Sequence, residues 1–236
     1  MNIGLIIAGG SGERMGQDIP KQFLVVHNKP VIVYTMEAFQ NHPSIDSIVV
    51  ICLDGWQQIV EAYSREFKIT KLEKILTGGA CGQESIRIGV NYLRENHCDN
   101  DIVLVHDAIR PMVSQEIISD CLRVCIQKGN AVATIPCLEA MFYTKDEETY
   151  EKQISRNNLK RAQTPQAAFL GKLIWAHEEA SRRGITQSIA TCTLLEELGE
   201  KVYMSKGSEK NLKLTTPDDI DIFIALLEVK PIDWMK

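Results

Sequence analysis

The sequence predicts an α/β protein whose mostly parallel, mixed sheet is covered by helices on both faces. Short apolar segments alternate with helical patterns along the whole 236-residue chain, as in doubly wound folds. The first apolar segment, residues 3–7, contains no charged side chain, which is typical of a strand buried on both faces. A glycine-rich turn follows it directly, at the strand end where α/β proteins bind ligands.

Strands are expected wherever a short apolar run lies between polar or glycine-rich turns. After residues 3–7, the runs that meet this description are 45–51, 72–76, 101–107, 131–135 and 201–205. The run 101–107 is the most apolar of them, and it ends in the polar pair His106-Asp107.

Helices are expected between these strands, where the residue pattern is helical. The segments are 31–40, 56–67, 83–95, 115–127, 170–182, 190–198 and 217–228. Pro217 suits the first turn of the last helix, and the carboxylates of Asp218 and Asp219 suit its positive end. The regular pattern is lost at about 137–161. We therefore expect one domain, residues 1–236, with this irregular segment inserted.

Composition and charge exclude several classes of protein. The chain is 44% hydrophobic and 24% charged, which is ordinary for a globular protein. Its net charge is -5 and it has no basic stripe, so no nucleic-acid partner is expected. No apolar run approaches about 18 residues, so no membrane span is expected. The first strand is not preceded by a basic segment, so we expect no signal peptide.

The seven cysteines are odd in number and include no Cys-x-x-Cys spacing. This usage predicts reduced thiols and a cytoplasmic protein. Cys121 and Cys125 lie four residues apart on an apolar helix face, so we expect them in the core rather than at a metal site.

The turn after the first strand, residues 9–16, has the composition of a phosphate-binding loop. It lacks both the P-loop spacing and the third glycine of the dinucleotide fingerprint, which also counts against a nicotinamide oxidoreductase. Arg14 and Lys21 place two cations beside backbone that can approach a ligand closely. Amide donors combined with fixed positive charge are what a triphosphate needs as its charge redistributes. The glycines concerned are Gly9, Gly10 and Gly12.

Two further polar loops, residues 78–85 and 106–111, also follow strands. The carboxyl ends of parallel strands meet at one edge of a sheet, so the three loops are expected to form one site. Asp107 could bind Mg²⁺ and bridge it to phosphates, or it could cap a helix or pair with Arg110. His106 is expected to be structural.

Two later segments add candidates. Thr164-Pro165 taken alone indicates a turn. Lys213 lies between a strand and the helix that begins at Pro217, where a lysine is usually solvated unless a site needs another cation.

Seven segments, taken in chain order, carry a family resemblance. They are Gly9-Gly10-Ser-Gly12-Glu-Arg14-Met15, Pro20-Lys21-Gln22, Gly78-Gly79…Ser85, His106-Asp107-Ala108…Arg110-Pro111, Arg156, Thr164-Pro165-Gln166 and Asn211…Lys213…Thr216-Pro217-Asp218-Asp219. Over about residues 3–228 the chain resembles the cytidylyltransferases that act on alditol phosphates. The resemblance implies a Rossmann-like nucleotidyltransferase fold, CTP as a substrate and Mg²⁺ as the cofactor. It also implies a homodimer that exchanges a protruding β-arm, residues 137–161.

The resemblance also implies a role for each site residue. Arg14 and Lys21 would stabilise the α-phosphorus while pyrophosphate leaves, and Arg156 and Lys213 would hold the phosphate of the acceptor. Arg156 would reach the partner's site through the arm, and Asp107 would lie by the metal and the ribose. The other residues implied to bind substrate are Ala8, Gly9, Gly10, Gly12, Gly79, Ala80, Ser85, Arg110 and Thr164.

The acceptor stays open between three alditol phosphates. 2-C-Methyl-D-erythritol 4-phosphate would place the enzyme in isoprenoid biosynthesis, and D-ribitol 5-phosphate in teichoic acid or capsule biosynthesis. Another small polyol phosphate, such as a glycerol phosphate, is the third option.

The chain departs from the family pattern mainly on the acceptor side. Glu139 and Ala140 stand where many relatives have Asp-Thr, and Thr191 lies where they carry an acidic residue. Gly82 replaces a residue that is often basic. A non-catalytic relative that still binds nucleotide is therefore the alternative from another class. The arm aromatics Phe142 and Tyr143 could pack against a partner subunit or line the acceptor pocket.

Overall fold

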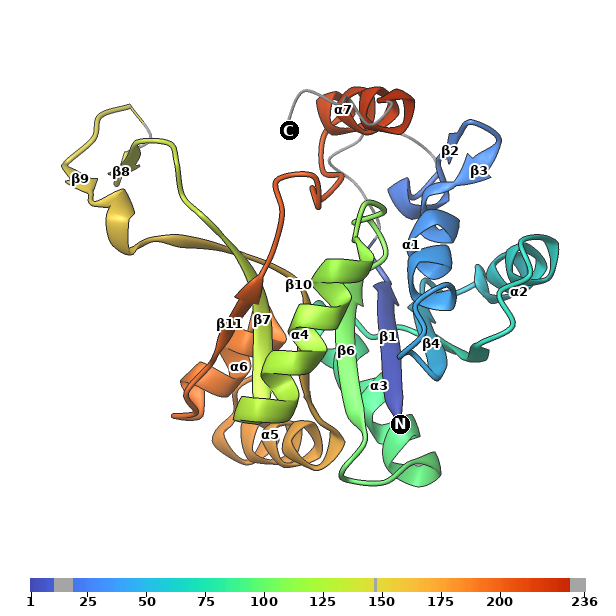
Figure 1. Ribbon diagram of the computed structural model, residues 1–236. Coiled ribbons are helices and arrows are strands. Elements are labelled where there is room, and N and C mark those ends of the chain that lie inside the picture. Colours follow the sequence, from blue (N-terminus) through green and yellow to red (C-terminus); the bar gives the residue numbers. More distant parts are fainter. Residues whose placement is uncertain (11–18, 147, 230–236) are drawn as a thin grey trace.

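The computed structural model describes residues 1–10, 19–146 and 148–229, which contain a central sheet of seven strands (Figure 1). The strands lie in the order β11-β7-β10-β6-β1-β4-β5. Their bounds are β1 (Asn2–Ala8), β4 (Ser47–Cys52), β5 (Leu72–Thr77), β6 (Ile102–Asp107), β7 (Asn130–Pro136), β10 (Lys160–Phe169) and β11 (Met204–Lys206).

Most neighbouring strands in this sheet are parallel. β1 pairs in parallel with β4 and β6, β4 with β5, and β11 with β7. β10 lies antiparallel between β6 and β7. The mostly parallel, mixed sheet expected from the sequence is therefore confirmed.

The sequence pattern does not predict β10. Residues 160–169 combine small and polar side chains with Pro165, and a proline normally argues against a central strand because it cannot donate to the ladder. The sheet accommodates it because the register between β10 and β7 shifts between Ala162 and Gln166, on either side of that proline.

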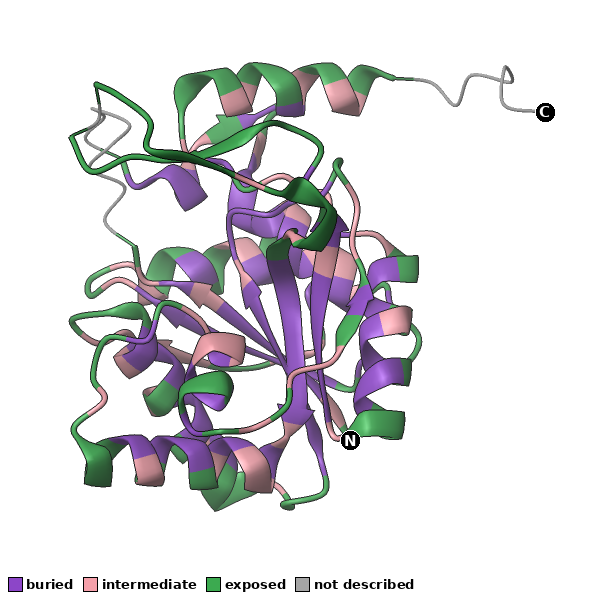
Figure 2. Cartoon of the chain, turned by 90° about the vertical axis from the view of Figure 1, so that its left-hand side faces the viewer, coloured by how far each residue is buried: buried purple, intermediate pink, exposed green. Residues whose placement is uncertain are grey.

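Helices cover both faces of the sheet, with α1, α2 and α4 on one face and α3 and α5 on the other (Figures 1 and 2). The strands β1, β4, β6 and β7 are almost continuously buried, as expected for segments without alternating polarity, whereas the edge strands β5 and β11 are largely exposed or half-buried. The helix bounds are α1 (Val31–Gln40), α2 (Gln57–Glu66), α3 (Gly82–Asn96), α4 (Gln115–Lys128), α5 (Leu170–Arg183), α6 (Thr191–Glu197) and α7 (Pro217–Glu228), with 3-10 turns η2 (Lys21–Phe23) and η3 (Arg156–Asn158).

Helix α7 lies over the carboxyl end of the sheet (Figure 1). It begins at Pro217 as predicted, and a capping box joins Thr216 to Asp219. Phe223 is fully buried and meets the Tyr34 ring edge-on, with 5.1 Å between ring centroids. The helix therefore closes the core above α1.

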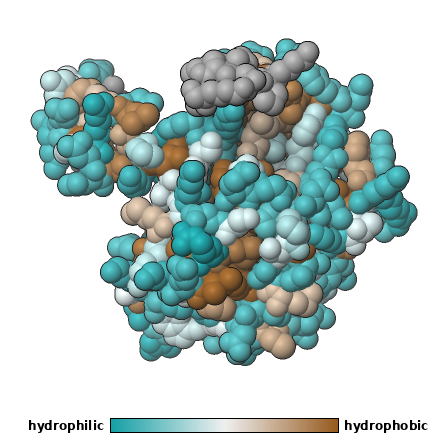
Figure 3. Space-filling model, in the orientation of Figure 1, coloured by the Kyte–Doolittle hydropathy of each residue, from teal (hydrophilic) through white to brown (hydrophobic). Residues whose placement is uncertain are grey.

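The irregular segment contains a two-stranded hairpin that protrudes from the body of the protein (Figure 1). β8 (Met141–Tyr143) pairs antiparallel with β9 (Lys152–Ile154), and the segment returns to the sheet through η3. The protruding β-arm is therefore confirmed. It exposes several large apolar side chains, and brown surface is visible on this lobe in Figure 3. These are Leu138, Met141, Phe142, Tyr143 and Tyr150.

Three other expectations can be compared with the structure. The last strand starts later than residue 201, because Asn130 donates to the carbonyl of Lys201 and accepts from the N–H of Tyr203 before β11 begins. Cys121 and Cys125 are fully buried in the core, as expected. Among the described residues, no helix has the length and apolar character that crossing a bilayer requires.

Candidate active site

Loops that follow β1, β5 and β6 converge on a cavity of about 510 Å³ at the carboxyl edge of the sheet. Its walls are Ile7, Ala8, Gly9, Gly10, Lys21, Gln22, Leu53, Gly79, Ala80, Cys81, Gly82, Ser85, Asp107, Ile109 and Lys213. Three segments that are far apart in the sequence, together with Lys213, therefore meet as the parallel sheet predicts. Gly12 and Arg14 lie outside the described residues.

The first loop leaves β1 at Ala8 and is held by a buried glutamine. Gln22 Nε2 donates to the carbonyl oxygens of Ala8 and Gly10, at 2.7 and 3.1 Å. Gly9 and Gly10 do not have positive φ, so that reason for glycine does not apply here. Close packing applies instead at Gly9, where a Cβ would lie 3.3 Å from Ser85 Oγ.

The second loop is fixed by the first turn of α3. Ser85 Oγ accepts from the N–H of Gly79 at 3.1 Å and donates to the carbonyl of Cys81 at 2.9 Å. Glu84 Oε2 accepts from the N–H of Ala80 at 2.8 Å. Two side chains of one helix therefore set the shape of the turn between β5 and α3.

Asp107 ends β6 and is the electrostatic centre of the cavity. Its Oδ2 accepts from Arg110 Nε at 3.1 Å and lies 3.1 Å from Lys213 Nζ. Burial alone would raise the pKa of Asp107, but the adjacent cations Lys213 and Arg110 outweigh it and hold the pKa below its usual range. Asp107 is therefore an ionised carboxylate that holds two cations.

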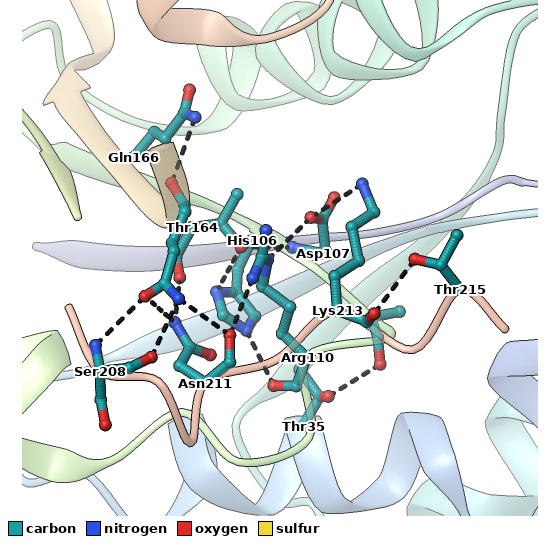
Figure 4. Close-up of polar contacts among 12 residues, drawn as sticks. Thr35, His106, Asp107, Arg110, Thr164, Gln166, Ser208, Asn211, Lys213 and Thr215 are labelled. Atoms are coloured by element: carbon teal, nitrogen blue, oxygen red, sulfur yellow. Dashed lines mark hydrogen bonds and ion pairs between the residues drawn. The ribbon is translucent and has the colours of Figure 1, made fainter. Parts of the chain in front are cut away.

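A buried polar network supports Asp107 from below (Figure 4). Thr164 Oγ1 accepts from the N–H of Asp107 and lies 3.0 Å from His106 Nδ1. His106 Nε2 lies 3.2 Å from the carbonyl of Arg110, to which it must donate. Burial lowers the pKa of His106 to about 4, so the ring is neutral and Nδ1 accepts from the Thr164 hydroxyl.

The same network holds Lys213 at the cavity. Arg110 Nη1 donates to the carbonyl of Asn211 at 2.8 Å, and the N–H of Leu214 donates to the carbonyl of Ile109 at 2.9 Å. Asn211 Nδ2 also donates to the carbonyl of Thr164 at 2.8 Å. The backbone on both sides of Lys213 is thus bonded to the β6 loop, and the Asn211 side chain joins the same segment to β10.

Arg110 and Thr164 are buried and do not line the cavity. Their hydrogen bonds position Asp107 and Lys213, so in this structure Arg110 and Thr164 hold the residues that line the cavity without lining it themselves. Arg156 lies on the arm and lines a separate cavity of about 320 Å³ with Gln153, Ser155 and Asn157. Lys21 and Lys213, by contrast, share the main cavity.

The donor set suits a Mg²⁺ ion carried by a triphosphate. Among the described residues, no group of three or more His, Cys, Asp and Glu side chains is placed to hold a metal ion. Mg²⁺ commonly binds one or two carboxylates together with substrate phosphates, and Asp107 offers one ionised carboxylate. Asp107 would therefore be the residue that holds the metal.

Three supporting residues have no role assigned by the sequence pattern: Gln22, Gln163 and Asn211. Gln163 Nε2 donates to the carbonyl of Ser208 at 2.9 Å, and its Oε1 accepts from Asn211 Nδ2 at 3.2 Å. Gln22 and Asn211 stand in the motif segments beside Lys21 and Lys213. That adjacency is the only signal in the sequence, because the partners of each side chain are remote.

Comparison with known proteins gives consistent matches over nearly all of the chain. A profile of the 2-C-methyl-D-erythritol 4-phosphate cytidylyltransferase (IspD) family matches residues 3–228. A ribitol-5-phosphate cytidylyltransferase of Lacticaseibacillus paracasei is 43% identical, covering 96% of this chain and 97% of the relative. A 2-C-methyl-D-erythritol 4-phosphate cytidylyltransferase of Clostridium botulinum is 33% identical, covering 95% and 96%.

Solved structures share the fold. A 4-diphosphocytidyl-2C-methyl-D-erythritol synthase superposes with a TM-score of 0.81 at 24% identity, covering 96% of this chain and 98% of that one. The 2-C-methyl-D-erythritol 4-phosphate cytidylyltransferase of Thermus thermophilus gives 0.77 at 26% identity, covering 95% and 98%. The sequence matches and the shared fold agree, and the chain therefore belongs to the 2-C-methyl-D-erythritol 4-phosphate cytidylyltransferase (IspD) family.

Proposed function

We propose that this protein is a cytidylyltransferase that joins CTP and D-ribitol 5-phosphate into CDP-ribitol and pyrophosphate. An oxygen of the acceptor's phosphate bonds to the α-phosphorus of CTP while the bond to the β-phosphate breaks. The observation that carries the nucleotide half is the cavity where two glycine-rich loops meet Lys21, Asp107 and Lys213. Nucleotidyl transfer needs positioning and charge stabilisation more than covalent help.

The choice of ribitol rests on the relatives. Ribitol-5-phosphate cytidylyltransferases of Lacticaseibacillus paracasei and Vibrio parahaemolyticus are 43% and 37% identical to this chain. Two relatives named for 2-C-methyl-D-erythritol 4-phosphate, from two Clostridium species, are each 33% identical to this chain. CDP-ribitol would supply activated ribitol phosphate for a surface polymer such as teichoic acid or capsule.

Each side chain has a proposed task in this reaction. Lys21, with Arg14, neutralises the charge that develops at the α-phosphate and on pyrophosphate. Asp107 aligns Lys213, and Lys213 binds the acceptor's phosphate. Asp107 would also hold Mg²⁺. When bound, Mg²⁺ would neutralise triphosphate charge and orient the leaving group.

Arg156 is proposed to complete the site of a second subunit. The arm carries it away from the main cavity of its own chain, and the exposed apolar side chains of the arm need a covering surface (Figures 1 and 3). In a homodimer that exchanges arms, Arg156 would reach the cavity of the partner subunit and the apolar side chains of the arm would be covered. A cytoplasmic location is also proposed, and the seven free cysteines agree with it.

A substrate panel tests the proposal. Pyrophosphate release is measured with CTP, Mg²⁺ and each of D-ribitol 5-phosphate, 2-C-methyl-D-erythritol 4-phosphate and glycerol 3-phosphate, and thermal shifts compare CTP with ATP and GTP. We expect the largest shift with CTP and the highest kcat/KM with ribitol 5-phosphate. Preference for another acceptor would overturn the ribitol assignment. Binding of CTP without turnover on any acceptor would favour a non-catalytic nucleotide-binding protein.

A further inference from the structure

Gln22 is the buried side chain that contacts the first glycine-rich loop from inside the protein. It is 1% exposed, and its Nε2 donates to the carbonyls of Ala8 and Gly10, at 2.7 and 3.1 Å. Ala8 is the last residue of β1 to pair with a neighbouring strand, where it pairs with Cys52. The Gln22 amide group therefore hydrogen-bonds the backbone at the point where strand pairing of β1 ends.

The bond to the Ala8 carbonyl orients the peptide plane between Ala8 and Gly9. The carbonyl and the following N–H of a trans peptide point in opposite directions, so the Ala8 carbonyl bonded to Gln22 sends the N–H of Gly9 the other way. Among the described residues, no acceptor takes the N–H of Gly9 or Gly10, and both glycines line the cavity. Unpaired amide groups at such an edge are donors available to an anion.

The turn that carries Gln22 is itself firmly anchored. Phe23, the next residue, is buried and stacks on Trp56 with 4.1 Å between ring centroids and planes 10° apart. Lys21, on the other side, lines the cavity. One short 3-10 turn therefore presents a cation to the cavity, holds the loop carbonyls and anchors both in the core.

We propose that Gln22 is a positioning residue for the nucleotide half of the reaction. Gln22 does not touch the nucleotide in this proposal. Its hydrogen bonds keep the carbonyls of Ala8 and Gly10 turned away from the cavity, so that the N–H of Gly9 faces the triphosphate. This inference rests on the proposed use of CTP. It predicts an effect on CTP that is separable from any effect on the acceptor, because the contacts of Gln22 are to the first loop and not to Lys213 or Asp107.

The test compares Gln22→Met, which keeps the shape but removes both donors, with Gln22→Glu, which keeps one donor only when protonated. Gln40→Met is the matched control, because Gln40 also joins two segments, through Thr70 and the N–H of Lys71, far from the cavity. CTP affinity is measured by calorimetry, KM is measured for CTP and for ribitol 5-phosphate separately, and folding is checked by circular dichroism.

We expect Gln22→Met to weaken CTP binding and raise its KM about tenfold, from the loss of two hydrogen bonds, with the KM for ribitol 5-phosphate unchanged. Gln40→Met should leave both KM values unchanged. Gln22→Glu should bind CTP poorly at pH 8 and recover as the pH falls toward 5.5, a recovery that the wild type does not show.

The outcomes separate this inference from the proposed function. Unchanged CTP affinity in folded Gln22→Met, or no pH-dependent recovery in Gln22→Glu, would overturn the positioning role while wild-type turnover stands. Wild-type protein that binds CTP without turnover would overturn the proposed reaction, and the affinities would still decide the role of Gln22. Wild-type protein that binds no CTP would overturn both.

Discussion

Acidification should destabilise this protein through His106. Burial lowers its pKa in the folded protein from 6.5 to about 4. As the pH falls below 6.5, the unfolded chain binds a proton at this position and the folded protein does not, so the free energy of unfolding decreases. The stability that neutral His106 contributes is therefore complete above pH 6.5 and is lost progressively down to about pH 4.

The size of the loss follows from the same two pKa values. pH 5 lies about 1.5 units below the pKa of His106 in the unfolded chain and still above its pKa in the folded protein. Each of these pH units lowers the free energy of unfolding by about 1.36 kcal/mol. Hence His106 alone should lower the free energy of unfolding by about 2 kcal/mol between pH 7.5 and pH 5. His106→Gln removes the titrating group and retains an amide that can donate to the carbonyl of Arg110.

Urea unfolding at pH 7.5 and pH 5, at fixed ionic strength, measures the effect. The variant loses ring packing against Phe39, whose centroid lies 5.2 Å away, so it should be less stable at both pH values. That constant loss cancels when the two pH values are compared within each protein. We expect the pH-dependent loss to be about 2 kcal/mol smaller in His106→Gln. The same pH-dependent loss in both proteins would refute a neutral, buried His106.

Three further predictions concern the site and its support. Arg156→Ala and Lys213→Ala should each abolish turnover but retain CTP affinity, and subunits of the two variants mixed in equal amounts should regain about a quarter of the wild-type rate if arms are exchanged. No regain would place Arg156 in its own subunit's site. Gly89→Ala should cost about 1–3 kcal/mol in urea unfolding, because its Cβ would lie 2.6 Å from a Leu5 methyl. Gly82→Ala, with nothing within 4 Å of its Cβ, is the control, and an equal loss there would contradict the packing argument. EDTA should stop turnover and excess Mg²⁺ should restore it, whereas activity that persists without divalent cations would exclude the metal role of Asp107.

Local patterns were sufficient for most of the elements. The apolar runs at 3–7, 45–51 and 101–107 correspond to β1, β4 and β6, because strands buried on both faces must be continuously apolar. β10 was not predicted because its strand conformation depends on remote neighbours. β6 and β7 pair with it on either side, although a segment that contains Pro165 has a low intrinsic propensity for a central strand. The hairpin of the arm is too short to leave a periodic pattern.

Residue types and chain order alone predicted that glycine-rich loops and basic residues would meet at one edge of the sheet, since glycines beside a strand end and nearby basic residues are local features. Only the tertiary structure decided how they are connected. It placed Lys213 3.1 Å from Asp107, put the Thr164 hydroxyl between His106 and the N–H of Asp107, and turned Gln22 toward two loop carbonyls. These contacts join residues 12 to 106 positions apart, and a buried polar group bonds to whichever partner the fold brings within reach.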